Sequence, residues 1–132
     1  MRVIGMIANS PVVMSVTQLV EHINGKSNRN ISLNNLNHCA NAILNHPGGN
    51  VAGGALNGIQ YRGNAIYHES RNLGGPNQAC TVFFADSGNG VAKLLAVGAH
   101  IGGAPGGHPV YTLDWVSNSW GAQWKQGTQV QL

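Results

Sequence analysis

Residues 80–101, CTVFFADSGNGVAKLLAVGAHI, decide the fold class of this chain. Two runs rich in β-branched, aromatic and other apolar residues, 80–86 and 91–101, flank a polar segment of Asp, Ser, Gly and Asn at 86–90. Glycine and asparagine tolerate the backbone conformations of tight turns, and such a turn between two apolar runs is typical of a β-hairpin. We therefore expect two antiparallel strands joined at 86–90.

Further strands are expected on both sides of this hairpin. The runs 58–62, 64–69 and 109–117 have a similar composition and are separated by Gly, Asn and Pro. The strand-rich part of the chain therefore begins at about Gly53 and continues towards the C-terminus.

The residues before Gly53 follow a helical period instead. Ser10 and Pro11 form a helix-start pattern, apolar residues recur at helical spacing after them, and Gly25 is a natural stop, which predicts a helix over 11–24. A second helix is expected between Ser32 and Asn45. Helices followed by strands predict an α+β domain, with N-terminal helices packed on an antiparallel sheet.

Length and charge limit the classes of function. The 132 residues fit a single domain, 1–132. The seven Lys and Arg residues are scattered and give a formal charge of only +3, so a nucleic-acid groove is not expected. No apolar run approaches the roughly 20 residues that span a bilayer, so we expect a soluble domain with no membrane contact. Two cysteines are too few for a disulfide framework.

The sequence NSWG at 118–121 follows the last expected strand. It resembles the segment of papain-family cysteine proteases in which an Asn orients the catalytic His and a Trp covers their contact. Cys39 and His100 precede Asn118 in the order of that family. The chain therefore resembles a small, bacterial-type papain-like fold.

The resemblance implies a cysteine peptidase that works by acyl transfer. Cys39 would attack the substrate carbonyl as a thiolate, His100 would protonate the leaving amine, and Asn118 would orient the imidazole. Asp114 is the alternative orienting residue, because such folds also use Asp. Since a helix N-terminus or an imidazolium lowers a thiol pKa, this assignment requires the second helix to begin close to Cys39.

Further site residues follow from the same resemblance. The oxyanion would be bound by the backbone amide of Cys39 and by one upstream amide side chain, where the family has Gln. That side chain would be Asn34, Asn35 or Asn37. The residues expected to contact substrate are Trp120, Gly102 and Gly103. No cofactor and no metal are expected.

The resemblance also implies a biological setting. Small, Gly- and Asn-rich papain-like domains resemble the toxin ends of bacterial effectors that are delivered into competing cells. The partners would then be a protein substrate in the target-cell cytoplasm and a cognate immunity protein that inhibits the toxin.

Other hypotheses remain open. The same fold hosts glutamine deamidases and transglutaminases. Helices followed by an antiparallel sheet also suit small bacterial ribonuclease toxins, although the scarce positive charge argues against this class. A non-catalytic binding module would use the tryptophans as a contact surface, and Cys39 would then be a buried apolar position. The ribonuclease hypothesis would use His100, Arg62, His68, Tyr111 and Thr112.

Overall fold

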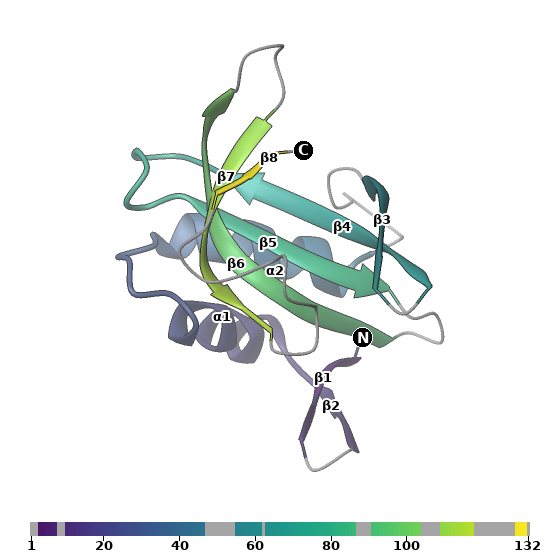
Figure 1. The fold of residues 1–132 in the computed structure, drawn as a ribbon. Coiled ribbons are helices and arrows are strands. Elements are labelled where there is room, and N and C mark those ends of the chain that lie inside the picture. Colours follow the sequence, from purple (N-terminus) through teal and green to yellow (C-terminus); the bar gives the residue numbers. More distant parts are fainter. Residues whose placement is uncertain are drawn as a thin grey trace.

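A computed structural model describes residues 3–7, 10–46, 55–61, 63–86, 91–103, 109–117 and 129–131 (Figure 1). Two helices pack against an antiparallel sheet, which confirms the predicted α+β class. The elements are β1 (Val3–Ile7), β2 (Ser10–Val13), α1 (Val16–Gly25), α2 (Leu33–Leu44), β3 (Ala55–Tyr61), β4 (Asn64–Arg71), β5 (Cys80–Asp86), β6 (Val91–Gly103), β7 (Pro109–Val116) and β8 (Gln129–Gln131).

The hairpin expected from residues 80–101 is confirmed as β5 and β6, and its turn lies outside the described residues. In the described part of the sheet, β3, β4, β5, β6, β7 and β8 pair in chain order, each antiparallel to the next. The long strand β6 also pairs through its first residues with β1, which runs parallel to it. The strands predicted from 58–69 and 109–117 correspond to β3, β4 and β7.

The first helix begins later than the sequence predicts. Ser15 is its N-cap and forms a reciprocal capping box with Gln18. The expected start at Ser10 is wrong, because Ser10–Val13 pairs with β1 as strand β2, where its β-branched valines are well suited. The second helix is confirmed, since Ser32 caps α2 and the helix ends at Leu44.

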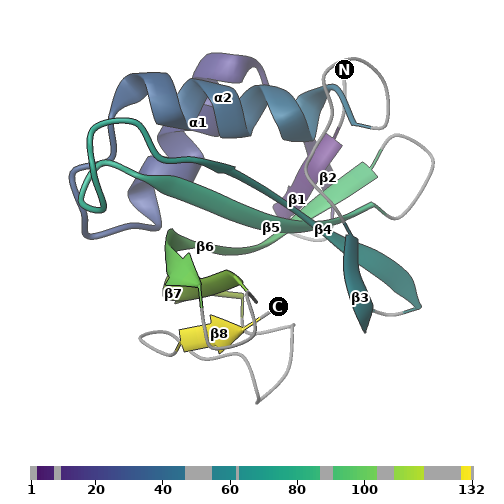
Figure 2. The same ribbon diagram turned by 90° about the horizontal axis from the view of Figure 1, so that it is seen from above.

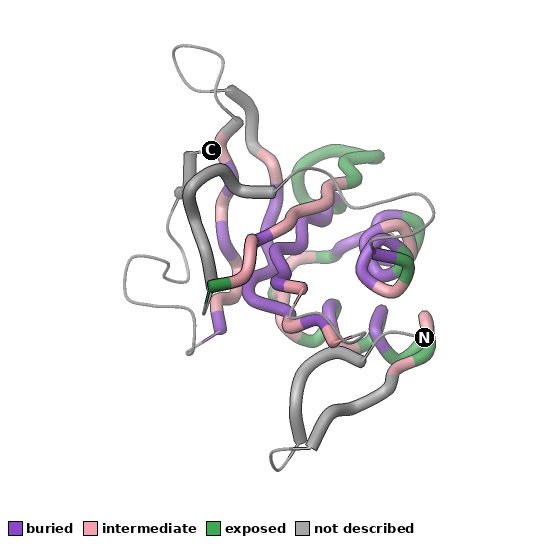
Figure 3. The backbone as a smooth tube through the Cα atoms, turned by 90° about the vertical axis from the view of Figure 1, so that its right-hand side faces the viewer, coloured by how far each residue is buried: buried purple, intermediate pink, exposed green. Residues whose placement is uncertain are grey.

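Both helices cover the same side of the sheet, here called the helix-covered face (Figure 2). The opposite side, the helix-free face, has its own buried cluster, and β7 and β8 curl beneath β5 and β6 on that side. In Figure 3 the buried residues lie in the central strands and within the helices. The helix-covered cluster includes Leu19, Ile23, Leu36, Cys39, Ile43, Cys80, Val82, Phe84, Leu94 and Val97. The helix-free cluster is Ile66, Phe83, Ala85, Leu95, Ala96, Tyr111 and Leu113.

Candidate functional site on the helix-free face

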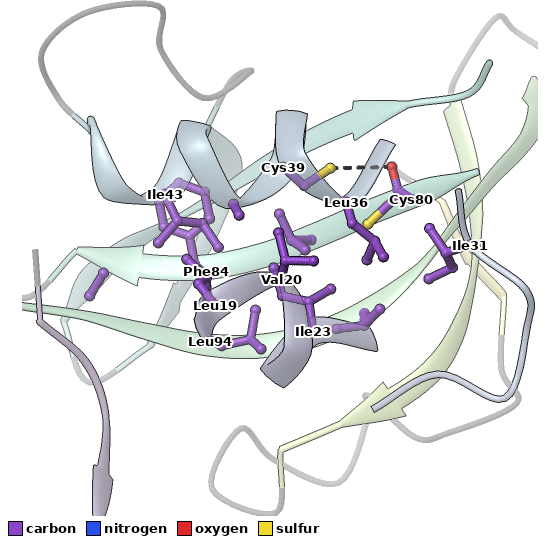
Figure 4. Close-up of a cluster of buried hydrophobic side chains, with 14 residues drawn as sticks. Leu19, Val20, Ile23, Ile31, Leu36, Cys39, Ile43, Cys80, Phe84 and Leu94 are labelled. Carbon is purple, nitrogen blue, oxygen red and sulfur yellow. Dashed lines mark hydrogen bonds between the residues drawn. The ribbon is translucent and has the colours of Figure 1, made fainter. Parts of the chain in front are cut away.

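Cys39 lies in the interior of α2, not at its start. The helix begins at Leu33, and its N-terminal cap is Ser32. The Cys39 side chain is 0% exposed and packs in the core between α2 and the sheet (Figure 4). Its thiol donates to the backbone carbonyl oxygens of Cys80, at 3.5 Å, and Glu69, at 3.7 Å. The predicted position of this cysteine beside a helix N-terminus is therefore wrong.

The surroundings of Cys39 disfavour a thiolate. A hydrogen bond with the Cys80 side chain and burial together raise the pKa of Cys39 well above its usual value. The Cys39 backbone amide is not a free oxyanion donor either, because only the first amides of a helix lack a partner within it. Cys80, the other cysteine of the chain, is also fully buried. The structure thus presents no exposed thiol to a substrate.

The sheet separates Cys39 from His100. His100 pairs with Tyr111 across β6 and β7, and Tyr111 belongs to the helix-free cluster. Since paired residues of antiparallel strands share a face, His100 lies on the helix-free face, opposite the face that Cys39 packs against. The structure does not bring these two members of the expected triad together.

Asp114 of β7 forms an ion pair with Arg29. It is the extra residue of a bulge in β7, since Val97 and Gly98 of β6 pair with Trp115 and Leu113. Arg29 donates from Nε to Asp114 Oδ2 at 2.8 Å. The same guanidinium donates to the carbonyl oxygens of Pro76, Ala79 and Gly98. Asp114 therefore fixes the loop between the helices, and orienting His100 is not the role that its contacts support.

The asparagines expected near the oxyanion have other positions. Asn35 is fully buried and its amide donates to the carbonyl oxygens of Leu73, at 2.9 Å, and Gln78, at 2.6 Å. Asn34 is exposed and Asn37 is half-buried on α2. Asn35 thus fastens the β4–β5 loop to the start of α2.

The remaining expected residues of the protease site lie partly outside the described residues. Asn118 and Trp120 are among those outside. Gly102 and Gly103 end β6, where they pair with Val110 and Pro109 of β7. Nothing in the described geometry joins these two glycines to Cys39.

The described residues do bring two histidines together around one tyrosine. The ring of Tyr111 lies 5.0 Å from the ring of His100 and 5.7 Å from that of His68, centroid to centroid. Phe83 contacts both Tyr111, at 5.5 Å edge-on, and His68, at 6.0 Å. Both histidines are partly exposed, whereas Tyr111 is only 4% exposed. We call His68, His100 and Tyr111 the histidine–tyrosine cluster.

The register of four strands, β4 to β7, builds this cluster. His68 of β4 pairs with Phe83 of β5, which pairs with Ala96 of β6. Tyr111 lies on β7, so its ring must cross β6 to reach Phe83 and His68. Gly98 of β6 lies on the same face and has no side chain there, and a Cβ atom at this position would collide with the Thr112 carbonyl.

A pair of hydroxyl groups adjoins the cluster. Ser70 Oγ lies 2.7 Å from Thr81 Oγ1, and Thr81 is fully buried. Burial raises the pKa of Tyr111, and a hydrogen bond from Ser70 opposes part of this shift. Tyr111 therefore stays protonated at neutral pH.

The sequence indicated part of this site. His100, His68 and Tyr111 belong to the set expected for a ribonuclease, whereas Arg62 lies outside the described residues. Thr112 follows Tyr111 along the strand and so points to the opposite face. Ser70 and Thr81 were not predicted as site residues from the sequence. Ser70 lies two residues after His68, and this spacing places Ser70 and His68 on the same face of β4.

Comparisons of the chain with protein-family models, with curated proteins and with solved structures found no match. The papain-like identity of the fold thus stays a prediction. Within the described residues, no three His, Cys, Asp or Glu side chains are grouped as metal ligands. Neither of the two described helices has the length and apolar character that crossing a bilayer demands.

Proposed function

We propose that the chain is a ribonuclease that cleaves RNA by acid–base catalysis at the histidine–tyrosine cluster. The observation that carries the proposal is that His68 and His100 both contact the ring of Tyr111 on one sheet face, at 5.7 and 5.0 Å. Imidazole is the side chain best suited to take and give protons near neutral pH. Two partly exposed imidazoles held around one rigid ring supply both a base and an acid.

The chemistry needs two proton transfers. One imidazole, in its neutral form, takes the proton of the ribose 2′-hydroxyl as that oxygen attacks the adjacent phosphorus. The other, as imidazolium, gives a proton to the 5′-oxygen that leaves. The products are a 2′,3′-cyclic phosphate and a free 5′-hydroxyl. The formal charge of +3 attracts a polyanion only weakly, so the proposal rests on the two imidazoles and not on the charge.

Tyr111 acts as a positioning residue in this scheme. Its ring contacts both imidazoles, and its burial in the helix-free cluster fixes the ring in place. The Tyr111→Phe variant keeps the ring and should retain most of the activity, with an unchanged pH profile. The Tyr111→Leu variant loses the ring contacts, so kcat should fall strongly while KM changes little.

The cysteine peptidase hypothesis has weaker support. Both cysteines of the chain are fully buried, and the pKa of Cys39 is raised. A deamidase or transglutaminase on the same fold would need the same exposed thiolate. These three activities therefore share one requirement that Cys39 does not meet.

The test is cleavage of an oligonucleotide that contains a single ribonucleotide in a DNA strand. The purified chain should cut at that ribonucleotide and leave a 2′,3′-cyclic phosphate, identified by mass spectrometry. The His68→Gln and His100→Gln variants should each lower the rate by about 10²- to 10⁴-fold, as expected for loss of a general acid or base.

A matched control comes from the other face of the sheet. His38 on α2 is also partly exposed, and its Nε2 lies 3.1 Å from Glu69 Oε1. The His38→Gln variant, purified in the same way, should cleave at the rate of the unmodified chain. Equal activity of all three histidine variants would reject the proposed site, because it would point to a contaminating nuclease.

Delivery into competing cells and a cognate immunity protein belong to the same proposal. An enzyme that cleaves cellular RNA harms the cell that contains it, so the producing cell needs an inhibitor. Expression of the chain inside bacteria should arrest growth and fragment RNA, and the His100→Gln variant should do neither. Growth arrest without RNA fragmentation would instead favour a protein substrate.

A further inference from the structure

The two cysteines of the chain meet in the helix-covered core. Both are free, and both are 0% exposed. The Cys39 thiol lies 3.5 Å from the carbonyl oxygen of Cys80, and the nearby Cys80 side chain is one cause of the raised pKa of Cys39. Figure 4 shows both sulfur atoms directed into the same space between α2 and β5. We propose that Cys39 and Cys80 form an internal disulfide when the chain meets an oxidising environment.

The location of Cys80 gives a reactant access to the pair. Cys80 is the first residue of β5, and residues 71–78 just before it are all exposed. This loop is held to α2 by the backbone amide of Ser32 and the side chain of Asn35, which both donate to the carbonyl oxygen of Gln78. Local opening of an exposed loop costs less free energy than global unfolding, so Cys80 can be reached from this end of the strand.

The proposed reaction is thiol–disulfide exchange with a low-molecular-weight disulfide such as oxidised glutathione. The Cys80 thiolate attacks one sulfur of the reagent, which forms a mixed disulfide and releases one thiol. Cys39 then loses its proton and attacks the Cys80 sulfur, and the second thiol of the reagent leaves. In total, the two protein thiols lose two electrons and two protons, and the reagent gains them as two thiols.

The disulfide would stabilise the fold without adding a new contact. The two cysteines are 41 residues apart in the sequence, and the segment between them includes the last five residues of α2 together with β3 and β4. A cross-link that closes a loop of this length restricts the unfolded chain and so favours the folded state. It would also fasten α2 to β5 whether or not the helix-free face has ribonuclease activity.

The experiment is refolding of the urea-unfolded chain in a buffer of reduced and oxidised glutathione, followed by quenching with an alkylating reagent under denaturing conditions. We expect most chains to take up no alkyl group, to weigh about 2 Da less than the reduced chain, as two lost hydrogens require, and to yield a peptide that links Cys39 to Cys80. The urea midpoint of these chains should exceed that of reduced chains.

Single-cysteine variants complete the test. Cys39→Ser and Cys80→Ser each leave one thiol, so neither should gain stability in the oxidising buffer. If the unmodified chain instead carries two alkyl groups, or glutathione on one cysteine with the other free, the pair does not close and the proposal is overturned. Loss of ribonuclease activity in the reduced chain bears only on the function proposed for the other face.

Discussion

The two faces of the central sheet contain chemically reactive side chains in opposite settings. On the helix-covered face, Cys39 packs among apolar side chains with no exposed surface and a raised pKa. On the helix-free face, His68 and His100 remain partly exposed around a buried Tyr111. Residue type alone therefore does not define a catalytic group, because a nucleophile or base must also be accessible and able to change its protonation state.

The largest expected loss of stability comes from breaking the ion pair that joins the loop between the helices to the sheet. Arg29 is the cationic partner of Asp114, and the side chains are only 16% and 9% exposed. Arg29→Ala leaves a mostly buried carboxylate and three carbonyl oxygens without this donor, so the free energy of unfolding should fall by about 3–5 kcal/mol. Urea denaturation followed by circular dichroism measures the change.

Arg71→Ala is the matched control for Arg29. Arg71 is exposed at the end of β4, so its removal should change the free energy of unfolding by no more than about 0.5 kcal/mol. If the two arginine variants lose equal stability, the contacts of Arg29 do not hold the helices to the sheet.

The next prediction compares the two faces of the sheet through two neighbouring phenylalanines. Phe83 and Phe84 are both 0% exposed, but Phe83 packs under the histidine–tyrosine cluster and Phe84 packs under the helices. Phe83→Leu and Phe84→Leu should each lower the free energy of unfolding by about 1–2 kcal/mol. Only Phe83→Leu should also slow RNA cleavage, because only Phe83 contacts Tyr111 and His68. A slower reaction in the Phe84 variant alone would contradict the proposal, because it would assign the chemistry to the helix-covered face.

Local sequence patterns predicted the helices and strands better than they predicted which strands pair with one another. The β5–β6 hairpin and α2 follow from turn residues, apolar spacing and the Ser32 cap, all within a few residues. Strand β2 could not be foreseen, because Ser10–Val13 becomes a strand only by pairing with β1. The Ser32 cap places Cys39 in the interior of the helix. The resemblance to a protease instead implies that Cys39 lies at the helix start.

The candidate site depends on contacts that no local pattern determines. Asp114 meets Arg29 from 85 positions away, and a bulge in β7 brings Asp114 to this position. A second bulge, in β6 opposite Phe83 and Phe84, sets which residues of β6 share a face with His68. Since a shift of one residue moves a side chain to the other face, the grouping of His68, His100 and Tyr111 required the register as well as the strands.

The smallest expected effect is the pH dependence of stability that His22 of α1 contributes. Burial, followed by the positive charges of Lys26 and Lys93, lowers the pKa of His22. The unfolded chain then binds a proton at His22 more readily than the folded chain does, so this residue destabilises the fold as pH falls through about 6.5. Above this range His22 is neutral in both states and contributes nothing.

His22→Gln isolates that contribution. The stability difference between the variant and the unmodified chain, from urea midpoints, should be constant between pH 7.5 and 8.5 and should shift in favour of the variant towards pH 5. A difference that stays constant down to pH 5 would mean that the pKa of His22 is the same in the folded and unfolded chains.

The most direct test of the central claim compares Cys39→Ala with His100→Gln on the same single-ribonucleotide substrate, after circular dichroism has shown that both variants are folded. Cys39→Ala should cost about 1 kcal/mol of stability, as the loss of one buried atom implies. We predict that this variant cleaves at nearly the rate of the unmodified chain and that His100→Gln is slower by about 10²-fold or more. Loss of activity in Cys39→Ala with full activity in His100→Gln would contradict the account and return the chemistry to the helix-covered face.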